Sequence, residues 1–251
     1  MKTPGTAASE ANGVEVGPVF DEEFGEPFGD GNGEVRGRVR SYAARRGRLS
    51  PLTRERMERL LPPHALPEGP LDPAAAFGRE APVVLEVGCG HGAAALAYAE
   101  THPGHDLVAV DVFTPALARM LAEAERRDLT NLWAHQGDAV LLLEQRIPVT
   151  TLAAVHLFFP DPWPKAKHSK RRFLARHTLD LVASRLVPGG HLLVATDHPV
   201  YADHARAELA ADARFTVTEG ERPSWRPTDG FEAKGLAAGR VVAEFRAVLT
   251  A

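Results

Sequence analysis

The 251-residue sequence contains a single cysteine, Cys89. One thiol cannot form a disulfide within the chain or supply a zinc cluster, which fits a reducing compartment. No apolar run approaches the roughly 18 residues that a membrane span requires, and the first residues lack the charged start and apolar stretch of a secretory signal. We therefore expect a soluble protein of the cytoplasm that does not enter a membrane.

Charge is nearly balanced over the whole chain but is unevenly distributed. The chain has 29 Lys and Arg residues against 33 Asp and Glu residues, which gives a formal net charge of −4. Residues 1–35 are Gly-rich, lack apolar periodicity and carry acidic residues opposed only by Lys2: Glu10, Glu15, Asp21, Glu22, Glu23, Glu26, Asp30 and Glu34. This composition predicts a disordered acidic tail.

The charge reverses directly after that tail. Between residues 36 and 59, arginines are opposed only by Glu55 and Glu58: Arg36, Arg38, Arg40, Arg45, Arg46, Arg48, Arg54, Arg56 and Arg59. Such an arm suits a phosphate backbone, because each contact releases counterions. A solvated linker neutralised by the acidic tail explains it equally well. We assign residues 36–80 to a basic arm with a helical segment, and residues 81–251 to one catalytic domain.

From residue 82 onward, short β-branched runs alternate with Ala- and Leu-rich stretches, which is typical of a parallel sheet covered on both faces. Seven strands are predicted, at 82–87, 106–111, 131–135, 152–158, 190–196, 214–219 and 241–249. Helices are predicted at 93–101, 114–127, 138–145, 171–187 and 199–211. Thr114 is expected to cap its helix, and Pro188-Gly189-Gly190 to end the helix over 171–187. The Pro- and Gly-rich stretch 220–240 is expected to be an irregular loop at the site.

The first predicted strand runs into a glycine-rich turn, Gly88-Cys89-Gly90-His91-Gly92. Glycines there allow a ligand to approach the backbone closely, because they have no Cβ. The spacing also fits the dehydrogenase fingerprint G-x-G-x-x-G/A, with Ala93 in the last position. Glycine spacing alone therefore does not separate a dinucleotide from S-adenosylmethionine.

Three acidic residues near strand ends favour S-adenosylmethionine. Glu86 precedes the glycines, where a carboxylate can face the ammonium group of this cofactor and would oppose a pyrophosphate. Asp111 ends the next strand, where a ribose diol would lie for either cofactor. Asp138 follows the third strand, near the expected adenine, although it is also placed to cap the helix behind it.

The most specific stretch follows the fourth strand, over residues 157–173. Prolines on both sides of Asp161 and Trp163 restrict the backbone, and the strand end directs the loop toward the cofactor turn. The Trp163 ring can stack on a base turned out of its helix, while Asp161 can accept hydrogen bonds from guanine. Five cations between Lys165 and Arg172 suit the flanking phosphates; the alternative is a solvated helix start.

Three further features carry less specific signals. Asp197 ends the fifth strand and can meet Lys165, a base edge or the free amides of the helix that starts at Pro199. Trp225, in the late loop, can serve packing or recognition. The histidines show no paired spacing on one helix face, so we expect no metal site.

Several blocks resemble, in the same order, those of the tRNA (guanine-N7-)-methyltransferases. The most characteristic is Phe158-Phe159-Pro160-Asp161-Pro162-Trp163-Pro164-Lys165 with Lys167-His168 and Lys170-Arg171-Arg172. The others are Arg40-Ser41-Tyr42, Arg46-Gly47-Arg48-Leu49, Leu85 to Gly92, Ala195-Thr196-Asp197, Arg226-Pro227 and Phe231-Glu232 with Lys234-Gly235. The resemblance covers the chain from about residue 38 to the end of the sequence.

The resemblance implies an α/β, Rossmann-like class I methyltransferase fold, with a seven-stranded, mostly parallel sheet and helices on both faces. It implies methyl transfer from S-adenosylmethionine to N7 of a guanosine in the tRNA variable loop, which leaves S-adenosylhomocysteine. Cofactor contacts fall to Glu86, Gly88, Gly90, Asp111, Asp138 and Asp161, catalysis to Asp161, and substrate contacts to Lys165, Asp197, Asp229, Gly230, Phe231 and Glu232. Asp111 stands where many members have Glu, and Asp229 where they commonly have Thr. The sequence leaves open whether the protein is a monomer or a homodimer.

Methyl transfer to guanine N7 needs no general base, because N7 has an in-plane lone pair and no proton. Alignment of the two reactants should dominate catalysis. We therefore expect Asp161 to orient the base and to stabilise the cationic product, without abstracting a proton.

Three other functions remain open. An Asp-Pro followed by an aromatic residue also resembles methyltransferases of exocyclic base amines, although those need a further proline before the aromatic residue. A nicotinamide-dependent dehydrogenase would share the glycine turn, but the sequence has no recognisable hydride-site acid or Tyr-Lys pair. An RNA-binding module with a decayed cofactor site would not need Glu86, the three glycines or Asp111.

Overall fold

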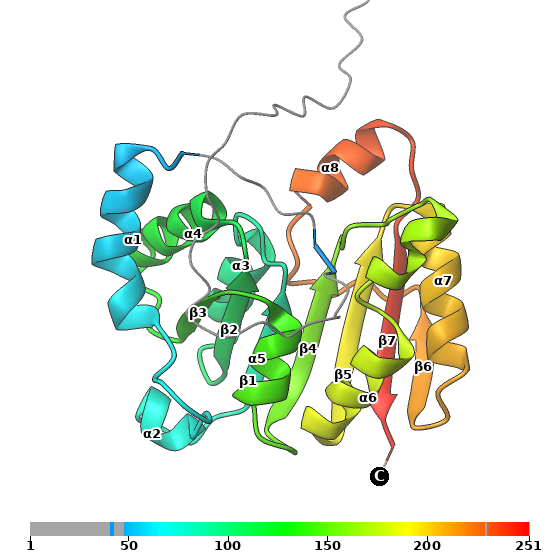
Figure 1. Cartoon of the computed structure of the whole chain (residues 1–251), viewed down its shortest axis with the longest axis horizontal. Helices are drawn as coiled ribbons and strands as arrows, with labels where there is room; N and C mark the ends of the chain where they lie inside the picture. Colours follow the sequence, from blue (N-terminus) through cyan, green and yellow to red (C-terminus); the bar gives the residue numbers. More distant parts are fainter. Residues whose placement is uncertain (1–40, 43–47, 229, 251) are drawn as a thin grey trace, which may run out of the picture.

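The computed structural model describes residues 41–42, 48–228 and 230–250, which form a seven-stranded sheet flanked by helices (Figure 1). The strands are β1 Val83–Val87, β2 Asp106–Asp111, β3 Leu132–Gln136, β4 Leu152–Phe158, β5 Leu186–Thr196, β6 Phe215–Glu219 and β7 Ala243–Leu249. The α-helices are α1 Pro51–His64, α2 Pro73–Phe77, α3 Ala93–Thr101, α4 Thr114–Arg126, α5 Ala139–Gln145, α6 Arg176–Arg185, α7 Pro199–Ala210 and α8 Gly230–Ala237. A 3₁₀ helix, η1, spans Ala166–Arg171.

All strands except β7 run in one direction. The sheet order is β3-β2-β1-β4-β5-β7-β6, and β7 pairs antiparallel with both β5 and β6. The pairs formed by β1, β2, β3, β4 and β5 among themselves are parallel. The predicted α/β, Rossmann-like fold with a mostly parallel sheet is confirmed. The carboxyl ends of six strands and the start of β7 therefore share one edge, the upper edge in Figure 1, which we call the site edge.

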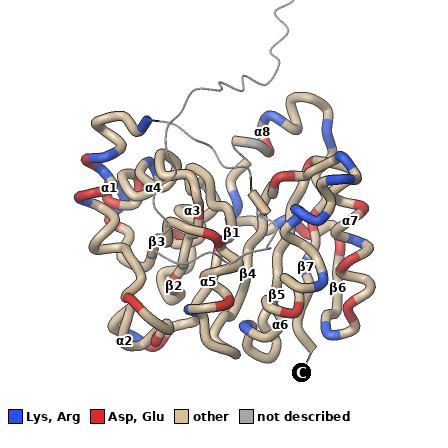
Figure 2. The backbone as a smooth tube through the Cα atoms, in the orientation of Figure 1, with Lys and Arg blue, Asp and Glu red and all other residues tan. Residues whose placement is uncertain are grey.

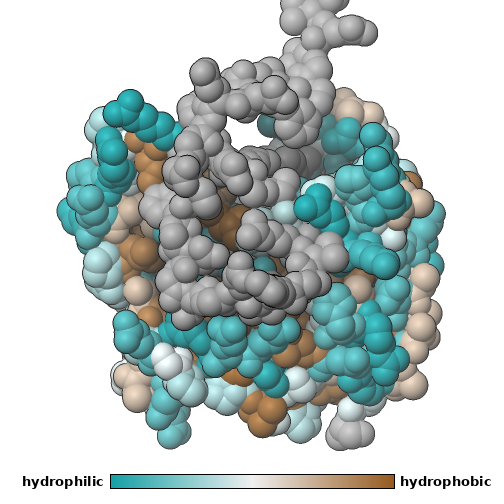
Figure 3. All heavy atoms as spheres, in the orientation of Figure 1, coloured by the Kyte–Doolittle hydropathy of each residue, from teal (hydrophilic) through white to brown (hydrophobic). Residues whose placement is uncertain are grey.

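The two faces of the sheet bury separate apolar clusters, because successive side chains of a strand point to opposite faces. In β1, Leu85 belongs to the cluster that includes residues of α5, α6 and α7, whereas Val84 belongs to the cluster that includes residues of α1, α3 and α4. Met57 and Leu60 turn α1 toward the second cluster, and its outer side is hydrophilic (Figure 3). None of the described helices is both long enough and apolar enough to cross a membrane.

The prediction of one helix over 171–187 is wrong in its extent. The chain forms η1, then runs non-helical through buried apolar residues, and α6 spans only Arg176–Arg185. Pro188-Gly189-Gly190 lies inside β5 and does not end a helix. The pairing of β4 with β5 shifts register at this point, so the proline and glycines mark an irregular strand.

Two other local predictions also differ from the structure. The stretch 220–240 is not wholly irregular, because it contains α8; Gly230 and Gly235 hide this helix from propensity arguments. The N-cap of α4 is Phe113, and Thr114 lies in the first turn instead. The Thr114 hydroxyl accepts a hydrogen bond from Gln136 Nε2 at 2.8 Å.

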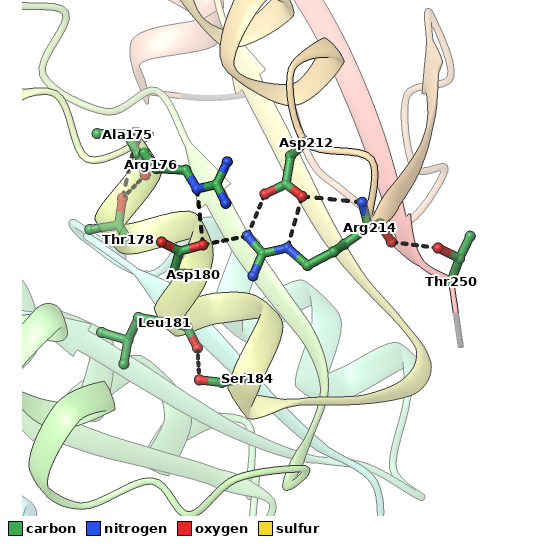
Figure 4. A network of polar contacts seen from close by, with 9 residues as sticks. All are labelled: Ala175, Arg176, Thr178, Asp180, Leu181, Ser184, Asp212, Arg214 and Thr250. Atoms are coloured by element: carbon green, nitrogen blue, oxygen red, sulfur yellow. Dashed lines mark hydrogen bonds and ion pairs between the residues drawn. The ribbon is translucent and has the colours of Figure 1, made fainter.

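Arg214 joins α6 to the start of β6, at the edge of the sheet opposite the site edge (Figure 4). Its guanidinium pairs with both oxygens of the buried Asp212 and donates to Asp180 Oδ1 at 2.7 Å. Arg176 Nε donates to the same Asp180 oxygen at 3.1 Å. The Arg214 carbonyl accepts from N and Oγ1 of Thr250, at 2.8 and 2.7 Å. This network fastens the end of β7 to the start of β6.

Asn131 provides a test of how α3 is held against β3. Its buried Nδ2 donates to the carbonyls of Ala99, His102 and His105, at 3.0, 3.2 and 3.0 Å. Asn131→Ala should lower the free energy of unfolding by about 1–3 kcal/mol, because these carbonyls lose their donor. Asn131→Asp keeps the volume but removes the amide donor, and should lose at least as much. Urea unfolding measures both, and an unchanged midpoint in either variant would contradict this role.

Candidate active site

The glycine-rich turn between β1 and α3 uses three left-handed residues. Gly88, Gly90 and Gly92 have φ of +71°, +55° and +79°, a region that L side chains rarely adopt. Gly88 N donates to the Val110 carbonyl of β2 at 2.8 Å. A Cβ on Gly88 or Gly90 would meet nothing within 4 Å, whereas one on Gly92 would lie 2.2 Å from Met120 Cγ. The turn is tied to β2 and leaves space beside its first two glycines.

Asp111 fastens this turn to the end of β2. Its Oδ2 accepts from Gly90 N and its Oδ1 from Phe113 N, each at 2.8 Å. The carboxylate therefore holds both the turn that follows β1 and the chain that follows β2. Its expected contact with a ribose diol remains a prediction.

Glu86 lies on the α3 side of β1 and is 3% exposed. Burial raises the pKa of its carboxyl to about 8. Oε2 has no hydrogen-bond partner among the described residues, and His156 Nδ1 of β4 lies 3.8 Å from it. Burial lowers the pKa of His156 to about 3, so the imidazole stays neutral and does not balance a carboxylate. A cationic group at Oε2 would stabilise the ionised carboxylate, which burial disfavours.

Asp138 follows β3 and caps α5. Its Oδ1 accepts from Val140 N at 2.8 Å, so the capping role considered from the sequence is confirmed, while the adenine contact remains a prediction. Among the residues that the structure describes, no group of three or more His, Cys, Asp or Glu is arranged to hold a metal ion.

The loop after β4 turns sharply at Phe159 and Trp163. These residues have φ of +50° and +42°, and such strained conformations persist only when the surroundings hold them. Phe159 N donates to a carbonyl of β5 at 2.8 Å. At the other end, the buried Arg172 donates from Nε to the Pro162 carbonyl at 3.2 Å and from Nη2 to the Trp163 carbonyl at 3.1 Å. Asp161 lies exposed between these two turns.

Residues of η1 contact the ring of Trp163. Its ring stacks with His168 at a centroid distance of 5.8 Å, and Arg171 Cζ lies 4.4 Å from the ring centroid. Its Nε1 donates to the Ser41 carbonyl at 3.3 Å. Arg172 is 8% exposed, so only four of the five cations expected at phosphates lie within reach of solvent. These four lie in or beside η1, near the site edge (Figure 2).

Asp197 directly follows β5 and pairs with Arg240, whose Nε donates to Oδ2 at 2.8 Å. The N-cap of α7 is His198, so the capping alternative for Asp197 is wrong. Gly235 of α8 packs against the same carboxyl group, since a Cβ there would lie 2.4 Å from Oδ2. Lys165 is the exposed residue before η1. Asp197 thus joins the end of β5 to the α8 segment, and the substrate contacts expected of Asp197 and Lys165 remain predictions.

The block predicted to contact substrate lies at the start of α8. Asp229 and the side chain of Phe231 lie outside the described residues, and Gly230 opens the helix with φ of +53°. Glu232 is 3% exposed and accepts from Arg222 Nε at 2.9 Å and from Arg226 Nη2 at 3.4 Å. Glu232 therefore has partners within the protein, and the substrate contacts of this block remain predictions.

Sequence reasoning missed the residues that join this late segment to the sheet. Arg226 is buried and forms a two-point ion pair with Glu244 of β7. Trp225 stacks on His156 with ring centroids 5.2 Å apart, which supports its packing role. The Arg226-Pro227 block singled out Arg226 but gave it no role, and no local signal marked Glu244 or His156.

Comparisons with known proteins agree with this geometry. A family model described as "Putative methyltransferase" matches residues 80–245. A tRNA (guanine-N(7)-)-methyltransferase of Mycobacterium avium is 42% identical over 219 residues, which cover 82% of this chain and 85% of that protein. One of Nitrosomonas europaea is 40% identical over 208 residues, covering 81% of this chain and 93% of that protein.

A solved structure supports the fold. The crystal structure of the 16S rRNA methyltransferase KamB matches with a TM-score of 0.50 at 18% sequence identity, covering 70% of this chain and 91% of that chain. At this identity the match concerns the fold alone.

Gly92 and Gly88 allow a test of the packed turn. Gly92→Ala should lower the free energy of unfolding by about 2–5 kcal/mol, because left-handed strain adds to a clash with Met120. Gly88→Ala is the matched control: it has a similar φ but meets no atom, and should lose about 1–2 kcal/mol. Urea unfolding of the cofactor-free protein measures both losses. Equal losses would contradict the close packing of Gly92 on Met120.

Proposed function

We propose that this chain, which belongs to the tRNA (guanine-N(7)-)-methyltransferase family, transfers a methyl group from S-adenosylmethionine to N7 of a guanosine in the variable loop of tRNA. S-adenosylhomocysteine is the second product. The observation that carries this proposal is the loop around Asp161, which lies at the same edge of the sheet as the glycine-rich turn. Left-handed turns at Phe159 and Trp163 fix the path of its backbone. We place this activity in the cytoplasm.

The residues of the turn fit S-adenosylmethionine. Glu86 Oε2, which is buried and without a partner in the described part of the chain, is an acceptor for the ammonium group. The space beside Gly88 and Gly90 admits the cofactor to the backbone. Asp111 and Asp138 follow on neighbouring strands, for the ribose and the adenine.

The cofactor supplies an electrophilic methyl group, and the protein supplies alignment. Guanine N7 attacks through its in-plane lone pair, so no residue has to remove a proton. Alignment of two bound reactants contributes on the order of 7–11 kcal/mol. Asp161 borders the cofactor, orients the base and stabilises the positive charge that develops on the purine.

We assign substrate contacts to Lys165, Asp197 and residues 229–232. The basic arm, whose arginine-rich part spans 36–59, would bind the tRNA phosphates through counterion release; of that part, residues 41–42 and 48–59 are among the described residues. The acidic tail over 1–35 lies outside the described residues, and its disorder stays a prediction.

Asp161→Asn tests the active-site assignment. Turnover should fall at least about tenfold, because the neutral amide no longer stabilises the cationic purine, while cofactor affinity should fall modestly. The assay is transfer of labelled methyl to unmodified total tRNA, with digestion and identification of the nucleoside. Asp203→Asn, at an exposed position of α7, is the matched control and should keep wild-type turnover. Intact turnover in Asp161→Asn would refute the assignment, and an N-methylated amine as product would favour an exocyclic-amine methyltransferase.

The raised pKa of Glu86 makes cofactor binding pH-dependent. Below pH 8 the free carboxyl is mostly protonated, and it must ionise to face a cation. Affinity should therefore rise about tenfold per pH unit between about pH 6 and 7, with close to one proton released. His156 stays neutral over this range, and the nearby Arg226 lowers the pKa of Glu86.

Calorimetry near pH 6.5, in two buffers of different ionisation enthalpy, counts the released proton. Glu86→Gln removes the titrating group and should release no proton. If both proteins released the same number, the titrating group would have to lie elsewhere.

A further inference from the structure

Arg226 is the buried centre of an ion cluster at the site edge. It is 3% exposed and pairs through Nη1 with Glu244 Oε2 at 2.9 Å, and through Nη2 with Glu244 Oε1. Nη2 also lies 3.4 Å from Glu232 of α8, which pairs in turn with Arg222. Two arginines thus face two carboxylates, and three of these four side chains, those of Arg226, Glu232 and Glu244, are buried.

The same guanidinium lies against the end of β4. Arg226 Cζ is 4.8 Å from the ring centroid of Phe158 and 5.5 Å from that of Phe159. At these distances a cation is attracted by the electron-rich faces of the rings. Phe159 is the residue whose left-handed φ starts the turn toward Asp161. Arg226 therefore connects β7 and α8 to the turn at Phe159, where the loop around Asp161 begins.

Stability alone does not account for a guanidinium at this place. Buried ion pairs can often be replaced by apolar side chains without loss of stability. Arg226 Nε is moreover a buried donor without a partner in the described part of the chain, which is unfavourable. The contact with the two phenylalanines is what distinguishes Arg226 from the pairing around Arg214 at the opposite edge.

We propose that Arg226 is a positioning residue for methyl transfer: its guanidinium supports the turn at Phe158 and Phe159, and thereby fixes one end of the loop that carries Asp161. Arg172 fixes the other end through the carbonyls of Pro162 and Trp163. This inference rests on the proposed function only for its kinetic consequence, because the support of the turn is a property of the protein itself.

The test compares Arg226→Met and Arg226→Lys with the wild-type full chain. In Arg226→Met, hydrogen exchange of the Phe159 amide should rise about tenfold or more, since the turn loses its support. The kcat for tRNA methylation should fall about tenfold or more, because small misplacements of reacting groups are costly, while KM for tRNA should change less than about threefold. Arg226→Lys keeps the cation but not the two-point pairing, so both effects should be intermediate.

Arg214→Met is the control, since it removes an ion-paired arginine from the network at the opposite edge. It should lower the thermal midpoint but leave both the Phe159 exchange and kcat within about twofold of wild type. The proposal is overturned if folded Arg226→Met shows unchanged exchange at Phe159, or raised exchange with kcat within about twofold of wild type. If Arg226→Met does not fold, Arg226→Lys decides by the same criteria. A wild type that forms no 7-methylguanosine would overturn the proposed function, while the exchange measurement would still decide whether Arg226 supports the turn.

Discussion

The parallel pairing of β1 with both β2 and β4 is the constraint on which the site depends. Strands that run in one direction end at one edge, so Glu86, Asp111 and the loop of Asp161 become neighbours although they are far apart in the chain. The register places Glu86 beside Ala109 and His156. A slip of one residue would turn Glu86 to the other face of the sheet and remove it from the turn.

The sheet that positions Glu86 also removes it from water. Because helices cover β1 on both faces, no solvent stabilises a charge on the carboxyl group of Glu86. The neighbouring His156 stays neutral. The loop of Asp161 shows the opposite solution, since it is exposed but has strained turns that are held by the atoms around them. One acid is fixed by burial and the other by its backbone. In each case the arrangement that fixes the position of the acid lowers the stability of the fold, which is common at functional sites.

Patterning predicted the sheet well because buried parallel strands need continuous apolar runs, and the strand-end acids followed from where such strands must end. It failed where a local signal had two meanings. Pro188-Gly189-Gly190 has the composition of a helix stop but lies in an irregular strand, and the glycines of α8 concealed a helix. The pairing of Arg226 with Glu244 had no signal at all, because an ion pair between distant residues leaves no periodicity in the sequence.

The reversed direction of β7 has a consequence for how this architecture can change. β6 ends and β7 begins at the same edge, and Glu219 pairs with Phe245 there, so the whole segment that contains α8 is a long hairpin connection. The pairing of β6 with β7 holds the two ends of this connection together, whatever its length. Doubling such a connection adds only about 0.6 kcal/mol of closure entropy. The segment that contains α8 can therefore change in length and composition while the strands beside the glycine-rich turn keep their geometry.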